Sequence, residues 1–217
     1  MENKLILTQD GSHTLLSEKF GVHYHSIFGA VNESEHVFMK EGLFQLRDKT
    51  IISILETGFG TGLNAWLTLQ KTANQVVSYT AFETNPIGAG LAAKLNYTET
   101  GGADNFLKLH TCEWNEPVKI APHFTLLKLN HPVQEYPLPR GIDLIYHDAF
   151  APDIQPELWD ITLFKKYFDC LNEGGILVTY CAKGNVKRAL REAGFNVERL
   201  QGPPRKRHML RATKPIT

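Results

Sequence analysis

The chain has 217 residues, of which 42% are hydrophobic and 21% are charged. This length suits one domain with some additional segments, and the composition is typical of a folded globular protein, which excludes disordered and collagen-like chains. The start is polar and no apolar run approaches the roughly 18 residues of a membrane span, so we expect neither a signal peptide nor a membrane anchor. Three widely spaced cysteines without a Cys-x-x-Cys pair argue against a disulfide framework or a zinc site and favour a cytoplasmic protein.

The charges are balanced overall but unevenly distributed along the chain. Residues 183–217 hold ten basic and two acidic residues, a net charge of +8, whereas residues 1–182 carry a net charge of −8. A basic end on a neutral protein predicts a local surface for an anionic partner. A solvated helix face followed by a charged tail is the alternative interpretation.

The first 48 residues predict an extension that precedes the main fold. Two extended runs, residues 4–9 and 12–17, flank Asp10-Gly11, and this dipeptide between apolar runs is a strong hairpin signal. A loop and then a helix from Asn32 to about Arg47 follow. We therefore expect a hairpin and a helix here, with the main domain in the remaining residues.

From residue 51 onward, segments with strand and helix patterns alternate. The predicted strands cover residues 51–55, 76–82, 124–129, 142–146 and 176–180, with a closing pair over 195–200 and 209–212. The predicted helices follow Gly62, begin at Pro86, run from Glu157 to about Leu171, and include Val186. Such alternation favours a mostly parallel, doubly wound α/β sheet, and the closing pair adds one antiparallel strand at an edge. This Rossmann-like layout over residues 49–217 resembles that of class I methyltransferases.

A glycine-rich loop, Glu56-Thr57-Gly58-Phe59-Gly60-Thr61-Gly62, joins the first of these strands to its helix. Its G-x-G-x-G spacing differs from the G-x-G-x-x-G/A of dinucleotide sites, and Glu56 suits an ammonium group but would repel a pyrophosphate. Glu83 closes the second strand, where a carboxylate can accept bonds from ribose hydroxyls; capping of the Pro86 helix is its alternative role. Together these features predict an S-adenosylmethionine site. The predicted cofactor-binding residues are Glu56, Gly58, Phe59, Gly60, Gly62, Asn64, Glu83 and Asp148.

Asp148 lies at the carboxyl end of the fourth predicted strand, the edge that faces the ligand in open α/β sheets. An amine that accepts a methyl group has a pKa near 10 and must lose a proton before its nitrogen can attack. A nearby carboxylate can orient the amine and accept that proton, while Phe150 and Pro152 supply an apolar wall. The alternative is a cap for the helix near Pro156, a role for which Asp153 is better placed.

The loop before the sheet supplies further candidates. Tyr24, His25 and Ser26 can fold over the crevice and meet the acceptor, or belong to an ordinary surface loop. His23 and His25 share one face of an extended segment, but no third ligand stands at a recognisable spacing, so we predict no metal site.

Several segments carry a resemblance to a known family: "ETGFGTGLNA", "FETNP", "HDAFAPDIQPELWD", "LFKK" and "GGILVTYCAKGNVKRALREAGFNV". They are similar to MnmC-like methyltransferases, the methyl-transferring part of the bifunctional tRNA 5-methylaminomethyl-2-thiouridine enzymes. The likeness runs from about Gly29 to Arg211. Its most specific parts are the Asp148-x-Phe150-Ala151-Pro152 motif and the Arg205-Lys206-Arg207-x-Met209 block.

The resemblance implies methylation of the aminomethyl nitrogen of a modified wobble uridine in tRNA, with S-adenosylmethionine as methyl donor and Asp148 as catalytic residue. We expect tRNA to bind by its anticodon region, with Lys206 and Arg207 on its phosphates. The predicted substrate-binding residues are Tyr24, His25, Ser26, Phe150, Pro152, Lys206 and Arg207. The chain has no segment for a flavin-dependent oxidase domain, so we expect a stand-alone enzyme and a separate oxidoreductase that supplies the aminomethyl substrate.

Three positions depart from the family pattern. Arg205 replaces a glycine, His208 replaces an acidic residue, and Asn130 stands where an acid commonly meets the adenine amino group. Two alternative functions therefore accompany the leading one: methylation of a small-molecule amine, and a non-catalytic binding role. The retained glycine loop, Glu83 and Asp148 disfavour the second alternative.

Overall fold

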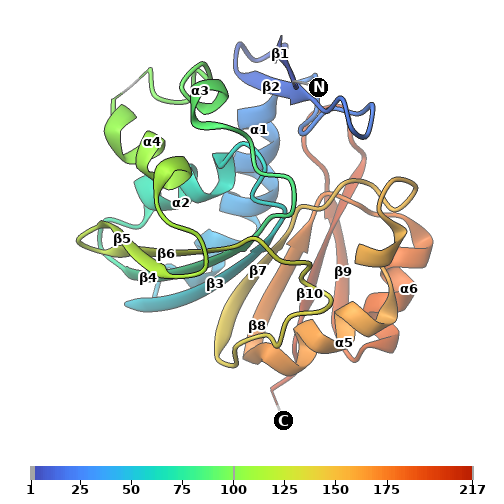
Figure 1. Cartoon of the computed structure of the whole chain (residues 1–217). Coiled ribbons are helices and arrows are strands. Elements are labelled where there is room, and N and C mark those ends of the chain that lie inside the picture. The colour runs from blue at the N-terminus through green and yellow to red at the C-terminus, as the bar shows by residue number, and fades with distance from the viewer. Residues whose placement is uncertain (1–2, 100, 217) are drawn as a thin grey trace.

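The structure is a computed structural model that describes residues 3–99 and 101–216. Among these residues eight strands form the main sheet: β3 (Ile51–Thr57), β4 (Val76–Phe82), β5 (Pro117–Ala121), β6 (Phe124–Leu129), β7 (Ile142–His147), β8 (Leu171–Thr179), β9 (Asn196–Gln201) and β10 (His208–Thr213). Their order across the sheet is β5-β6-β4-β3-β7-β8-β10-β9 (Figure 1). The five strands from β6 to β8 in this order run parallel, which confirms the predicted mostly parallel α/β fold.

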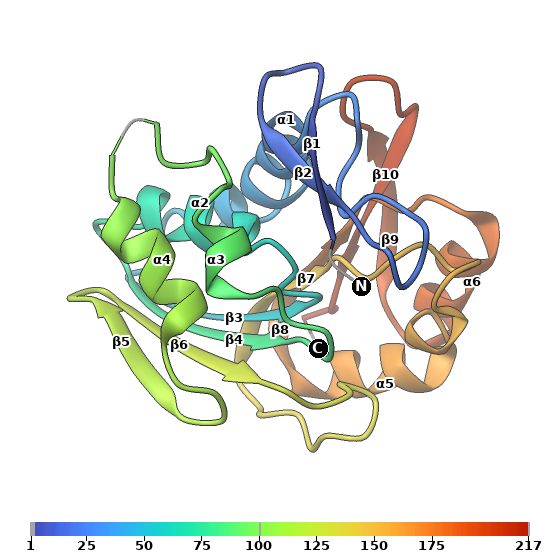
Figure 2. The ribbon, with the colours of Figure 1, turned by 45° about the horizontal axis from the view of Figure 1, so that its top comes forward.

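Alternate residues of the central strands serve two hydrophobic cores, one on each face of the sheet. Ile54 packs in the first core and its neighbour Leu55 in the second, because successive side chains of a strand point to opposite faces. The first face is covered by α1 (Ala30–Ser34), α2 (Leu63–Lys71) and α4 (Ala103–Thr111), and the second by α5 (Ile161–Cys170) and α6 (Gly184–Glu192) (Figure 2). Burial on both faces explains the continuous apolar runs of these strands.

The predicted antiparallel strand exists but does not lie at the edge. β10 is inserted between β8 and β9 and is antiparallel to both. Its Met209, Leu210 and Ala212 are buried, whereas no residue of β9 is fully buried, so the more apolar strand takes the inner position. The antiparallel edge strand is instead β5, at the other end of the sheet. β5 and α4 both come from residues 100–123, where no element was predicted.

The predicted N-terminal hairpin is confirmed: β1 (Lys4–Leu7) pairs antiparallel with β2 (His13–Leu16). The single helix predicted from Asn32 to Arg47 is wrong in its extent. α1 is followed by a π-helical stretch, Glu35–Lys40, and by a separate 3₁₀ turn, Leu43–Leu46. The break falls at Gly42, where a Cβ would lie 2.6 Å from the carbonyl oxygen of Phe38, so the chain packs too closely there for any larger residue.

Two further helix boundaries differ from prediction. No helix begins at Pro86: the N–H of Asn85 donates to the Glu83 carboxylate at 2.7 Å, the chain turns, and only the short α3 (Ala89–Ala92) follows. The helix expected from Glu157 is a 3₁₀ turn, Pro156–Leu158, followed by α5, because Asp160 caps α5 by accepting the N–H of Leu163 at 2.9 Å. Asp153, the predicted cap, pairs with Lys183 instead.

The N-terminal segment shares a core with the main sheet. Leu15, Ala30, Val37 and Phe38 belong to the same buried cluster as Ile52 and Ile54 of β3. Residues of the two predicted segments, 1–48 and 49–217, thus pack in one core, and the division between them stays a prediction. None of the described helices has the length and apolar character needed to cross a membrane.

Candidate active site

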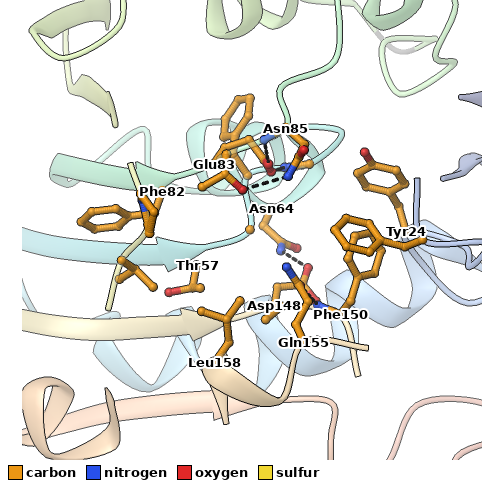
Figure 3. A pocket seen from close by; sticks show the side chains of 18 of the residues that line it. Tyr24, Thr57, Asn64, Phe82, Glu83, Asn85, Asp148, Phe150, Gln155 and Leu158 are labelled. Atoms are coloured by element: carbon orange, nitrogen blue, oxygen red, sulfur yellow. Dashed lines mark hydrogen bonds between the residues drawn. The ribbon is translucent and has the colours of Figure 1, made fainter. Parts of the chain in front are cut away.

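A cavity of about 280 Å³ opens at the carboxyl ends of β3, β4 and β7 (Figure 3). This edge is where open α/β sheets bind ligands. Its lining comes from the glycine loop and the start of α2, the loops after β4, β6 and β7, and the N-terminal segment: residues 57–61, 63–64, 82–85, 131–134, 148–150, 155, 157 and 158, with Phe20, Tyr24 and His25. One cavity thus brings together segments from much of the chain.

The glycine loop is pressed between two other parts of the site. Gly58 and Gly60 have φ angles of +89° and +52°, which L side chains rarely adopt. A Cβ on Gly58 would lie 2.7 Å from the carbonyl oxygen of Asp148, and one on Gly60 would lie 3.0 Å from the Tyr24 ring. The loop therefore needs glycine both for its conformation and for its close packing, and it forms the floor on which a ligand would lie.

Glu83 stabilises this loop and also faces the cavity. Its carboxylate accepts the N–H of Gly60 at 2.9 Å and the N–H of Asn85 at 2.7 Å (Figure 3). Burial raises the pKa of Glu83, while those backbone donors oppose the rise. Each carboxylate oxygen has a second lone pair, so the side chain can still accept bonds from ligand hydroxyls. The alternative role as a cap of a helix at Pro86 fails, because no helix begins there.

Asn64 connects two carboxylates. Its Nδ2 donates to Glu56 Oε1 at 3.0 Å and to Asp148 Oδ2 at 2.8 Å. Glu56 is fully buried and does not line the cavity, so its predicted direct contact with a ligand stays a prediction without support from the cavity lining. Burial, and then the charge of Asp148, raise the pKa of Glu56 well above its usual range. Within the described chain, Glu56 Oε2 and Asn64 Oδ1 are buried atoms without a hydrogen-bond partner.

Asp148 sits at the centre of the site, beside an aromatic wall. Burial and the nearby charge of Glu33 raise the pKa of the Asp148 carboxyl well above its usual range. The Phe150 ring lies 5.0 Å from that of Phe20 and 5.2 Å from that of Tyr24, measured between centroids. Burial, then the charge of Glu83, raise the pKa of Tyr24 to about 12. The arrangement is a carboxylate of increased basicity at one side of an apolar, aromatic space.

The remaining predicted substrate residues divide into two groups. His25 lines the cavity, and burial lowers its pKa to about 4, which keeps the imidazole neutral. Ser26 and Pro152 do not line it, and the N–H of Ser26 donates to the Glu33 carboxylate at 2.9 Å. The predicted role of these two residues as direct contacts therefore lacks support from the cavity.

Lys206 is partly exposed and already has partners within the protein. Its ammonium pairs with the Glu33 carboxylate and lies 4.3 Å from the centroid of the Tyr180 ring. The Tyr180 hydroxyl in turn donates to the carbonyl of Ala149 at 2.9 Å, next to Asp148. The prediction that Lys206 contacts phosphate is therefore at odds with its surroundings. Arg207 is exposed and makes no ion pair with any described residue, so it remains available.

Sequence reasoning missed several residues that shape the site. Gln155 accepts the N–H of Phe150 at 3.0 Å through its side-chain oxygen, and the Trp159 indole donates to the Phe150 carbonyl at 2.7 Å, so both hold the aromatic wall. Gln134 lines the cavity after β6, and its Oε1 is buried without a partner in the described chain. Gln155 and Trp159 lie in the segment HDAFAPDIQPELWD that carries the family resemblance, but the sequence does not reveal the path of the loop through which they act, and Gln134 lies outside every such segment.

The cavity suits S-adenosylmethionine in its donor and acceptor groups. Glu83 can accept from ribose hydroxyls, and the unpartnered oxygens of Gln134 and Asn64 can accept from amino or ammonium groups. Gly58 and Gly60 of the glycine loop line the cavity, so their backbone borders the space that a ligand would occupy. Elsewhere, the described residues contain no cluster of three His, Cys, Asp or Glu side chains that could hold a metal ion.

Comparison with known proteins gives matches of two kinds. A family described as S-adenosyl-L-methionine-dependent methyltransferase matches residues 108–215. The tRNA 5-methylaminomethyl-2-thiouridine biosynthesis bifunctional protein MnmC of Burkholderia thailandensis is 31% identical over 95% of this chain, which covers 34% of that protein. The protein of the same name from Idiomarina loihiensis is 32% identical over 90% of the chain, which covers 36% of it. The chain thus spans about a third of the length of these relatives.

Solved structures agree with this assignment. The crystal structure of MNMC2 from Aquifex aeolicus matches with a TM-score of 0.81 and 25% identity, over 99% of this chain and 72% of that one. Spermidine synthase from Thermotoga maritima matches with a TM-score of 0.57 and 16% identity, which shows a shared fold. Together with the glycine loop, Glu83 and the sheet order, these matches show that the chain belongs to the S-adenosyl-L-methionine-dependent methyltransferases and uses S-adenosyl-L-methionine as its cofactor.

Proposed function

We propose that this protein transfers a methyl group to the aminomethyl nitrogen of a modified wobble uridine in tRNA, converting 5-aminomethyluridine to 5-methylaminomethyluridine. The observation that carries the proposal is the position of Asp148, a carboxylate of raised pKa between the glycine loop and the Phe150 wall. The printed names of the relatives, which concern 5-methylaminomethyl-2-thiouridine in tRNA, support the choice of substrate.

Each end of the cavity has a distinct task in this proposal. Glu83 binds the ribose hydroxyls, and the Gln134 oxygen accepts from the adenine amino group. Asn64, held by Glu56 from below, presents its free oxygen to the ammonium of the methionine part. When bound, the cofactor supplies a methyl group activated by its sulfonium charge.

At the other end, Asp148 prepares the acceptor. A primary amine arrives mostly protonated at neutral pH. The Asp148 carboxylate binds it, accepts one proton from it and so frees the nitrogen lone pair, while Phe150 and Tyr24 exclude water and hold the uracil ring. General-base assistance of this kind contributes typically about 10²–10⁴-fold to a rate. His25, neutral at physiological pH, adds no competing positive charge.

The basic end of the chain supports RNA binding at the same edge of the sheet. The start of β10 pairs with the carboxyl end of β8, so the β9–β10 turn that carries Arg205 and Arg207 lies on the cavity side. Lys206 of this turn instead holds Glu33 near Asp148. We place the reaction in the cytoplasm, where tRNA is modified. We also expect an oxidoreductase, separate or joined to this chain, to supply the aminomethyl group.

Transfer of labelled methyl groups tests the proposal. The protein is incubated with methyl-labelled S-adenosylmethionine and either tRNA that lacks only the final methyl group or the free 5-aminomethyluridine nucleoside at equal concentration. We expect rapid labelling of the tRNA, and loss of that labelling in the Asp148→Asn variant. Labelling of the nucleoside as fast as the tRNA would favour the small-amine alternative. Cofactor binding without transfer to either would favour a non-catalytic role.

A further inference from the structure

An exposed aromatic residue and an exposed arginine meet on the surface close in the chain to His25, which lines the cavity. The guanidinium carbon of Arg205 lies 5.6 Å from the centroid of the Phe28 ring, and 37% of the surface of Phe28 is exposed. Phe28 precedes α1, whereas Arg205 lies in the turn between β9 and β10. Figure 2 shows this turn beside α1 and the β1–β2 hairpin. A single exposed apolar side chain is ordinary, so the contact of this ring with an exposed guanidinium, rather than its exposure, is the feature of interest.

The backbone of Arg205 supports that explanation. Its φ angle is +71°, in the left-handed region that non-glycine residues rarely enter. The turn is closed on either side by bonds from Lys206 N to Pro203 O at 2.9 Å and from Gly202 N to Arg207 O at 3.1 Å. A large side chain kept at a position suited to glycine is strained, and such strain gathers at ligand sites.

The pair is also fixed in place from beneath. Lys206, next to Arg205, pairs with Glu33, and Glu33 in turn accepts the N–H of Ser26, two residues before Phe28. His25, which precedes Ser26, lines the cavity. A rigid connection thus runs from the cavity wall to Phe28 and Arg205, so a ligand in the cavity and one on this pair would have a defined spacing.

We propose that Phe28 and Arg205 form a stacking platform for the base of a nucleotide that neighbours the methylated nucleotide in a single-stranded RNA loop. Unstacked RNA bases are bound on aromatic rings and on guanidinium planes, and this pair offers both. Arg205 and Arg207 make no ion pair with any described residue, which leaves two cations for the adjoining phosphates. This inference rests on the proposed function, since it requires RNA as the substrate.

Two variants of the platform test it in the full chain. Phe28→Leu keeps an apolar side chain without a ring, and Arg205→Gly removes the guanidinium while relieving the left-handed strain. Fluorescence anisotropy measures binding of an anticodon stem-loop RNA with a 5-aminomethyl wobble uridine, and calorimetry measures binding of S-adenosylhomocysteine. We expect each variant to bind the RNA about 5- to 20-fold more weakly, the lower part of the range for a lost base stack, with the S-adenosylhomocysteine affinity unchanged within about twofold.

Controls separate this effect from misfolding and from general loss of charge. The melting temperature of Arg205→Gly should stay within about 2 °C of the wild type, because relief of strain offsets the lost ring contact. Arg191→Ala removes an exposed cation from the far end of α6 and should leave RNA affinity within about twofold. If the wild type methylates tRNA and both platform variants bind RNA as it does, the platform alone is overturned. If the wild type does not bind the RNA, the proposed function falls as well.

Discussion

At the scale of single residues, the side-chain amide of Asn64 donates hydrogen bonds to two carboxylates. Asn64 donates to both Glu56 and Asp148, and each of these carboxyls has a raised pKa because of burial. The shared donor orients Asp148 and opposes the rise of its pKa, but burial and the charge of Glu33 outweigh this effect and keep Asp148 a stronger base than a surface aspartate. The roles of the two acids follow from their positions, since Asp148 lines the cavity and Glu56 does not.

Replacing Asp148 with asparagine tests its catalytic role. The side chain keeps its shape and can still accept the Asn64 amide, but it cannot accept a proton. We expect kcat to fall by about 10²–10⁴-fold while S-adenosylhomocysteine affinity and the melting temperature change little. Single-turnover kinetics and calorimetry provide the two measurements. A loss of stability with an unaltered rate in the folded fraction would mean that Asp148 is structural.

The buried carboxyl of Glu56 should make the stability of the protein depend on pH. Its folded pKa is raised above 4.5, so the native state favours the protonated acid. The stabilising contribution of this group is full below about pH 4.5 and is lost as the pH rises through the folded pKa. Glu56→Gln cannot ionise, so the stability of the cofactor-free variant relative to the wild type should increase as the pH rises. Urea denaturation at several pH values measures this difference, and parallel stability curves would refute it.

At the scale of elements, the strands were predicted well and the helices less so. β6 has the predicted bounds, because a buried parallel strand needs a continuous apolar run with breakers at its ends. The predicted helix after Pro86 is absent because the hydrogen bond from the Asn85 N–H to the Glu83 carboxylate forms a turn there, and this turn depends on the folded site. The break at Gly42 was missed for a similar reason, since the chain there packs closely against the Phe38 carbonyl and against Val178 of β8. Contacts that form only in the folded protein leave no periodic pattern in the sequence.

The Glu33–Lys206 ion pair joins α1 to the β9–β10 turn, and its removal should be costly. The Glu33 side chain is only 8% exposed, so Lys206→Met leaves a nearly buried carboxylate without its cation. We expect the variant to lose about 2 kcal/mol of unfolding free energy, the range for a lost bond to a charged group. Adding Glu33→Gln should restore part of that loss, as a double-mutant cycle by urea denaturation measures. Additive losses would show that the pair does not couple these elements.

At the scale of the whole molecule, the structure shows which of the described basic residues of the C-terminal segment are paired and which lie unpaired on the cavity side. Of the ten basic residues after position 182, Lys183, Lys206 and Arg211 are held in ion pairs, while Arg205 and Arg207 lie free on the cavity side. The sequence thus pointed to a basic surface and to part of the cavity lining, including Glu83, Asp148 and Phe150. It did not reveal the burial of Glu56 or the pairing of Lys206 with Glu33, because both depend on segments distant in the chain.

This distribution predicts how RNA binding depends on salt. Each phosphate contact to single-stranded RNA contributes a slope of about 0.7 to the plot of log affinity against log salt concentration. Arg207→Ala should therefore reduce that slope by about 0.7. Arg191→Ala, at the C-terminal end of α6 and away from the cavity, should not change it. Anisotropy titrations from low to physiological salt measure both. Equal slopes for the two variants would place the phosphates elsewhere.

Nucleoside analysis of the reacted tRNA tests directly whether this protein methylates an amine on the wobble uridine. The tRNA is incubated with the protein and labelled S-adenosylmethionine, digested to nucleosides and examined by mass spectrometry, with Asp148→Asn in parallel. We expect the label in the 5-methylaminomethyl group of the wobble uridine, and we expect Asp148→Asn to nearly abolish it. Label on another nucleoside or on a ribose hydroxyl, at equal rates in both proteins, would contradict the proposed function.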